Sequence, residues 1–167
     1  MFPGESYFAS LDVARSKLTV QKVTGGPLSD PNEDRPFAFL PDKNQVFFYE
    51  CVVTNGAIER QGTWVYDVAA NSFTDLKPAR QPPADPQTVE YLSTQNAVFA
   101  VIRGGQQWIY SFDRNTWAPL PMASDSPMVF ETPYAQTVYS AKYGILVNLG
   151  RNGTAAMRPD ITQMTWP

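Results

Sequence analysis

Thr63 to Leu76 read TWVYDVAANSFTDL, and Gln107 to Leu120 read QWIYSFDRNTWAPL. Aligned without gaps, the two stretches place tryptophan on tryptophan, tyrosine on tyrosine and asparagine on asparagine, 44 residues apart (108 − 64). A self-match at such a period is typical of repeat architectures, in which each repeat is one small unit stacked on its neighbours. The chain is therefore expected to consist of copies of one unit.

Each copy has the composition of a β-hairpin. Trp64, Val65 and Tyr66 are aromatic or β-branched, and a second short run follows from Phe73, which is the pattern of two strands. Asn71 falls in the polar break between them, where a residue that tolerates left-handed backbone favours a tight turn. Because a single hairpin is marginal in water, these strands are expected to be the outer pair of larger sheets.

A second repeated segment precedes each of these hairpins. PFAFLPDKNQVFFY, residues 36–49, matches QTVEYLSTQNAVFAV, residues 87–101, with Asn44 meeting Asn96 at an offset of 52 residues (96 − 44). Both segments predict strand, polar turn, strand. The full unit therefore has four antiparallel strands, made of an inner hairpin followed by an outer hairpin.

Weaker copies stand at both ends of the chain. Asp12-Val13-Ala14 repeats Asp67-Val68-Ala69, and AQTVYSAKYGILVNLG at 135–150 is a third inner hairpin, after which Met164 stands where Trp117 does. A four-stranded sheet repeated at this period is a β-propeller blade. We expect one all-β domain, 1–167, that contains three full blades and one additional outer hairpin. Its parts are an outer hairpin at 1–23 and blades at 24–78, 79–122 and 123–167.

Among propellers the chain resembles the kelch family. The resemblance rests on the Gly104-Gly105 doublet after the second strand, on Tyr66 and Tyr110 in the third, and on an aromatic residue seven positions later. It implies a propeller ring that is built from several such blades. Since a closed ring has roughly four to eight blades, three do not close one. The chain is expected to form a homo-oligomer or to be a fragment of a longer chain.

The composition excludes several kinds of chemistry. The chain has no histidine, so it has no imidazole base and no histidine-ligated metal; this counts against the copper oxidases that the kelch resemblance includes. A lone cysteine, Cys51, excludes an internal disulfide and a cysteine metal cluster, and its place at the end of an apolar run predicts a buried small hydrophobe. We expect no metal, no cofactor and no enzymatic activity.

The charge and hydropathy patterns exclude two kinds of partner. A net charge of −3 without a basic stripe argues against nucleic acid. No apolar run approaches the length of a membrane span, and the first residues lack the features of a signal peptide. A soluble protein is therefore expected, in a compartment that the sequence leaves open.

Binding is expected on the loops that join the strands at one end of the sheets. These long-loop segments are 24–35, 52–62, 77–86, 103–106, 121–133 and 150–153, while the opposite end has only tight turns. Four arginines lie on or beside them: Arg60, Arg80, Arg103 and Arg151. One hypothesis is an arginine-lined mouth that receives a carboxylate or an acidic peptide. The alternative is that these arginines are solvated or form structural salt bridges.

The sequence thus predicts a non-catalytic kelch-like scaffold that binds a protein partner through its long-loop face. One alternative is a carbohydrate-binding or enzyme-associated propeller segment of a larger protein. Another is a half-propeller that self-assembles. The repeated aromatic residues do not favour sugar binding, because their recurrence on strands predicts packing between blades.

Overall fold

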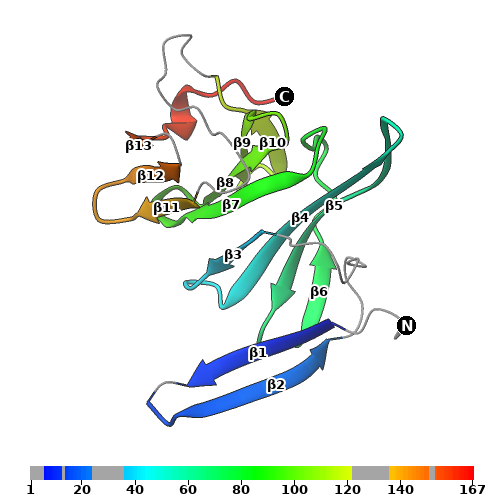
Figure 1. Ribbon diagram of the computed structural model, residues 1–167, viewed down its shortest axis with the longest axis vertical. Coiled ribbons are helices and arrows are strands. Elements are labelled where there is room, and N and C mark those ends of the chain that lie inside the picture. The colour runs from blue at the N-terminus through cyan, green and yellow to red at the C-terminus, as the bar shows by residue number, and fades with distance from the viewer. Residues whose placement is uncertain (1–5, 13, 24–35, 122–135, 151–152) are drawn as a thin grey trace.

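The computed structural model describes residues 6–12, 14–23, 36–121, 136–150 and 153–167. Its strands form antiparallel sheets stacked one after another (Figure 1). The N-terminal hairpin pairs β1 (Ser6–Asp12) with β2 (Lys17–Val23). The first sheet contains β3 (Phe37–Leu40), β4 (Gln45–Thr54), β5 (Ala57–Asp67) and β6 (Ser72–Asp75). The second sheet contains β7 (Pro86–Leu92), β8 (Ala97–Ile102), β9 (Gln107–Ser111) and β10 (Thr116–Pro119). The third contains β11 (Gln136–Ser140), β12 (Ile145–Gly150) and β13 (Gly153–Met157).

The two four-stranded sheets confirm the predicted all-β unit. In each sheet every strand pairs with the strand before it in the chain, so the spatial order equals the sequence order. The β3–β4 and β5–β6 turns therefore lie at one end of the first sheet, which we call the tight-turn face. The β4–β5 turn and the link from β6 to β7 lie at the other end, which we call the long-loop face.

Asparagines close the tight turns, as the repeat predicts. Asn44, Asn71, Asn96 and Asn115 all have left-handed backbone, with φ between 46° and 52°. In the outer turns the Tyr66 and Tyr110 hydroxyls donate to Oδ1 of Asn71 and Asn115, each at 2.7 Å. The Asn115 amide also donates to the Leu76 carbonyl of the first sheet at 2.8 Å. The repeated tyrosine and asparagine thus join the turn both to its own strand and to the preceding sheet.

We expect Asn115→Ala to lower the free energy of unfolding by about 3–4 kcal/mol in urea titrations. The change removes two hydrogen bonds, worth about 1 kcal/mol each, and places a β-carbon in left-handed backbone at a cost of about 1–2 kcal/mol. Asn115→Gly removes only the first contribution and should cost less. Asn71→Ala is the matched control. The hydrogen bond from the Asn71 side-chain amide to the preceding unit is longer, at 3.4 Å, so this substitution should cost less than Asn115→Ala. Equal losses for alanine and glycine would contradict the backbone argument.

Hydrophobic side chains fill the spaces between neighbouring sheets. The cluster between the first and second sheets includes Phe47, Tyr49, Tyr110 and Trp117, each at most 1% exposed. A second cluster between the second and third sheets includes Phe99. A third joins the N-terminal hairpin to the first sheet. Five of the six repeated aromatic residues therefore pack between units, as predicted: Tyr66, Phe73, Trp108, Tyr110 and Trp117. The sixth, Trp64, is half-buried and belongs to none of these clusters.

The third sheet differs from the prediction, because it has three strands rather than four. Where the fourth strand was expected, residues 161–163 form a short 3-10 turn. The Asp160 carboxylate accepts the Thr162 amide at 3.0 Å, and Pro159 has no amide to donate to a ladder. Met164 is nevertheless buried between the second and third sheets. It takes the place that Trp117 occupies one unit earlier, as the alignment predicts.

The segment 52–62, predicted as a loop, is instead an arm of two strands. β4 and β5 continue past the rest of the sheet to a turn at Asn55 and Gly56, where φ is 52° and 80°. Two consecutive positive φ values are those of a type I′ hairpin, for which Asn-Gly is the preferred pair. Figure 1 shows the arm projecting beyond the other strands.

Glu90 joins the second sheet to the third. Its carboxylate accepts the Tyr139 amide of β11 at 2.8 Å. Burial raises the pKa of this carboxyl above its ordinary value, although the hydrogen bond from Tyr139 opposes the shift. The folded protein therefore binds a proton more readily at Glu90 than the unfolded chain does.

This shift predicts the sign of a pH dependence. Because the folded-state pKa is raised, Glu90 lowers stability as pH rises from the ordinary glutamate pKa through the raised value. Glu90→Gln, which keeps an acceptor for Tyr139, should be more stable than the wild type at pH 7. The two proteins should converge at pH values below the ordinary glutamate pKa. Thermal unfolding across this pH range is the measurement, and a wild type that is more stable at pH 7 would contradict the prediction.

Candidate functional site

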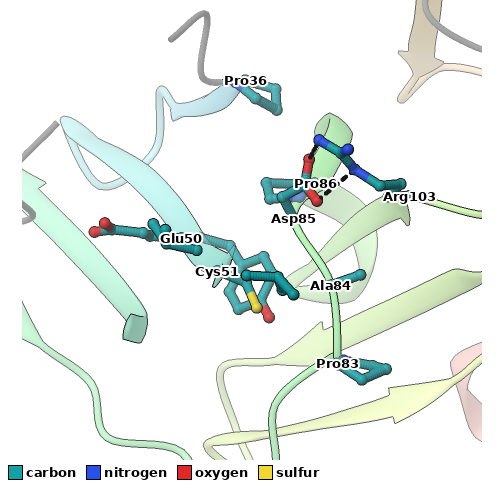
Figure 2. Close-up of a pocket in the computed structure, with 11 residues that line it drawn as sticks. Pro36, Glu50, Cys51, Pro83, Ala84, Asp85, Pro86 and Arg103 are labelled. Carbon is teal, nitrogen blue, oxygen red and sulfur yellow. Dashed lines mark hydrogen bonds and ion pairs between the residues drawn. The ribbon is translucent and has the colours of Figure 1, made fainter. Parts of the chain in front are cut away.

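The long-loop face contains a cleft of about 440 Å³ between the first and second sheets. One wall is β4 from Tyr49 to Val53, and the other is the segment Pro83–Pro86 that leads into β7. Arg103, at the end of β8, and Pro36, just before β3, complete the lining. Figure 2 shows Glu50 and Cys51 on the strand facing this proline-rich segment. The cleft therefore lies where the sequence predicted binding, on the loops that join the repeated units.

Hydrogen bonds hold the proline-rich wall beside β4. The Tyr49 hydroxyl donates to the Pro82 carbonyl, and the Gln61 side-chain amide donates both to that carbonyl and to the Tyr49 oxygen. Further along, the Arg103 amide donates to the Asp85 carbonyl at 2.8 Å. Tyr49 is only 1% exposed, so these bonds form the base of the cleft rather than its open surface.

One ion pair borders the cleft, and a second involves Glu50 of the β4 wall. The Arg103 guanidinium donates to both oxygens of Asp85, at 2.8 and 2.9 Å, as Figure 2 shows. Arg60 Nε donates to Glu50, whose side chain is 3% exposed. A buried carboxylate paired with arginine is costly to disrupt, whereas an exposed pair contributes little. Glu50 stands between Tyr49 and Cys51 in β4, so its side chain points to the face of the first sheet that is turned away from the second sheet. Its pair with Arg60 is therefore a structural element of the first sheet, whereas Asp85 with Arg103 lies at the open side of the cleft.

The structure brings one of the four predicted arginines to the cleft. Arg103 lines it, whereas Arg60 pairs with Glu50 and is not among the lining residues. Arg80 lies instead over the ring of Trp108, with its guanidinium carbon 5.0 Å from the ring centroid. Arg151 lies outside the described residues.

Two ionisable groups in the cleft are held in their neutral forms. Cys51 is 4% exposed, and burial raises the pKa of its thiol. Burial also raises the pKa of the Tyr49 hydroxyl. Since the thiolate rather than the thiol is nucleophilic, burial disfavours the nucleophilic form of Cys51. The predicted buried character of Cys51 is confirmed, although the residue also contributes to the cleft wall.

The sequence indicated the face but not the cleft itself. The sequence predicts a loop at 52–62 because charged residues interrupt the apolar run there. The cleft was missed because part of its wall is the strand that this segment forms instead. Asn55-Gly56 was the available signal, since this pair between extended segments is the strongest short hairpin signature. No sequence pattern indicates that Glu50 is buried and paired, because its ion pair with Arg60 forms only when β4 and β5 lie side by side.

Among the described residues, no group of three or more metal-ligating side chains comes together. No helix in this part of the chain has the length and apolar character required to cross a membrane. No protein-family model matches the chain, and no curated protein is similar to it in sequence.

Proposed function

We propose that the chain is part of a kelch-like propeller and that it binds a protein partner in the cleft on its long-loop face. The observation that carries this proposal is the cleft itself, which β4, a proline-rich segment and the Asp85–Arg103 ion pair define. Its volume of about 440 Å³ falls in the range of ligand sites. The repeated Tyr–Asn turns and the Gly104-Gly105 doublet support the kelch part of the proposal.

The chemistry of the cleft favours binding over catalysis. Its thiol and its buried phenol are protonated at neutral pH, because burial raises both pKa values. The carboxylates of Glu50 and Asp85 are paired with arginines of the same chain. These groups can form hydrogen bonds to a ligand and define the shape of the cleft, but they do not provide a nucleophile and a base. We therefore propose a non-catalytic role.

The ion pair at the open side of the cleft also bears on the kind of partner. An acidic ligand would have to compete with Asp85 for Arg103, the one arginine that lines the cleft. We therefore propose that main-chain and apolar groups of the partner make most of the contacts, and that Arg103 adds one polar contact at the open side.

Selection from phage-displayed libraries of peptides and small domains tests the proposal. Binders selected on the immobilised chain are measured again on Val53→Arg and on Val138→Arg. Val53 lines the cleft and is 43% exposed, whereas Val138 is a 53% exposed strand valine of the third sheet. We expect Val53→Arg to weaken the selected binders about tenfold or more, which is about 1.4 kcal/mol. Equal affinity for the two variants would overturn the proposal.

Self-association is a second candidate, favoured by apolar residues that are exposed on the first and third sheets. Phe37 and Phe39 of β3 are 59% and 51% exposed, whereas Val89 and Tyr91, their counterparts in β7, are 4% and 6% exposed because the first sheet covers them. The exposed face of the third sheet includes Val138. Light scattering distinguishes the candidates: a discrete oligomer that Phe39→Arg dissociates supports self-association, and a monomer contradicts it.

A further inference from the structure

A second cavity lies where the first strands of the three sheets come together. β7 contacts both β3 and β11, and each of these strands is at the end of the strand order of its sheet. The cavity has a volume of about 350 Å³ and is lined by residues of all three strands. Pro41, Ser93 and Ala141, from the connections that follow these strands, complete the lining, so the cavity lies toward the tight-turn face. We call it the inner-strand pocket, and it shares no lining residue with the cleft.

Glu90 brings to this pocket a carboxylate that no cation of the described residues neutralises. Its Oε1 accepts the Tyr139 amide at 2.8 Å, and it takes part in none of the ion pairs among these residues. Lys43 of the β3–β4 turn is engaged elsewhere, since its Nζ donates to Asn96 and lies 3.7 Å from the centroid of the Phe112 ring. Burial raises the pKa of the Glu90 carboxyl, which agrees with a charge that lacks a counter-ion.

Aromatic residues form much of the remaining pocket wall. Phe37 and Phe39 of β3 are 59% and 51% exposed, and Tyr139 of β11 lies on the other side. The Tyr139 hydroxyl shares a hydrogen bond with Thr94 Oγ1, which holds this ring beside the pocket. Aromatic rings attract cations through their quadrupole and give apolar contact to the alkyl substituents of such a cation. The wall is therefore suited to an organic cation rather than to a hydrated metal ion.

We propose that the inner-strand pocket binds an alkylated ammonium group, with Glu90 as its counter-ion and Phe39 and Tyr139 as its aromatic contacts. Aromatic side chains commonly recognise quaternary ammonium groups through cation–π attraction, and the carboxylate adds a direct charge interaction. The volume of about 350 Å³ falls in the range of small-ligand sites. The ammonium group belongs either to a small molecule or to a methylated lysine of a protein. This site is separate from the cleft and does not depend on the proposed binding there.

Choline, added to the full chain and followed by nuclear magnetic resonance, tests the proposal. The control probe is the neutral analogue in which carbon replaces the ammonium nitrogen, because it has the same shape without the charge. We expect choline to shift the amide signals of residues 90–94 and 136–141, and to bind about tenfold or more tightly than the analogue. N-acetyl-trimethyllysine distinguishes the sources: tighter binding than choline indicates a protein side chain, and weaker binding indicates a small molecule. Equal affinity for choline and its analogue, or no shift with either ammonium probe, would overturn the proposal.

Variants of the full chain test the assigned residues. Glu90→Gln removes the charge, keeps an acceptor for Tyr139 and should weaken choline binding about tenfold or more. Glu59→Gln makes the same change at an exposed glutamate of the β4–β5 arm and should leave binding unchanged. Phe39→Leu keeps an apolar side chain without the ring and should weaken binding about threefold. Because Glu90→Gln is expected to be more stable than the wild type at pH 7, lost binding does not arise from unfolding. If Glu90→Gln and Glu59→Gln bind choline equally, Glu90 is not the counter-ion and the proposal is overturned.

Discussion

Trp117→Ala should lower the free energy of unfolding by about 3–5 kcal/mol, the usual cost of truncating a buried large aromatic side chain. Trp117 has no exposed surface and packs on Phe47, Tyr49 and Tyr110, with ring centroids 5.9, 5.2 and 5.4 Å away. Its Nε1 also donates to Thr63 Oγ1 of the first sheet at 3.0 Å. The side chain thus connects two sheets, and denaturant titration followed by far-ultraviolet circular dichroism measures its contribution.

Two further variants separate packing from hydrogen bonding. Trp117→Phe keeps a large ring but removes the donor to Thr63, and should cost less than the alanine variant. Trp166→Ala removes a partly buried tryptophan beside the third sheet and is the control for the loss of an indole. If Trp166→Ala is as destabilising as Trp117→Ala, the packing between the first and second sheets is not the main source of stability.

Arg60→Ala should cost about 3 kcal/mol or more, because it removes the paired cation from a carboxylate that is 3% exposed. Arg103→Ala is a matched control with the same change of charge. Its partner Asp85 is 32% exposed and Arg103 itself is 74% exposed, so its loss should cost about 1 kcal/mol or less. Both values come from urea titration at neutral pH.

The double variant Glu50→Gln/Arg60→Ala tests the physical reason. If the cost of Arg60→Ala comes from the buried carboxylate, replacing that carboxylate by a neutral amide should recover most of the lost stability. Additive destabilisation by the two substitutions would contradict this explanation. Equal losses for Arg60→Ala and Arg103→Ala would show that burial of Glu50 does not govern the effect.

Much of the fold could be predicted because the signals are local and repeated. Both outer hairpins have strand composition, a polar break and an asparagine with left-handed backbone, Asn71 in one and Asn115 in the other. In the structure each asparagine accepts a hydrogen bond from the tyrosine at the matching position of its own hairpin. Two copies of one pattern reduce the chance that either match is accidental. The offset also located Met164 correctly, although its strand does not form.

The failures arose where local pattern and tertiary context disagree. The charged residues at 59 and 60 made the segment of the extended arm resemble a loop in the sequence. The register of the arm depends on the Asn55-Gly56 turn and on a bulge between Val52 and Val53. The fourth strand of the third sheet was expected from one position, Met164, without strand composition around it. The candidate cleft depends on contacts between units, such as Tyr49 with Pro82. No periodicity within one unit encodes these contacts.

Hydrogen–deuterium exchange across the whole chain, with and without a saturating selected binder, shows whether the binder occupies the cleft. We expect protection at the long-loop face, in the amides of β4 from Tyr49 to Val53 and in the segments 83–86 and 103–106. Exchange at the tight turns 41–44, 93–96 and 141–144 should not change. Protection of those tight turns, with β4 unaffected, would contradict the assignment of binding to the cleft.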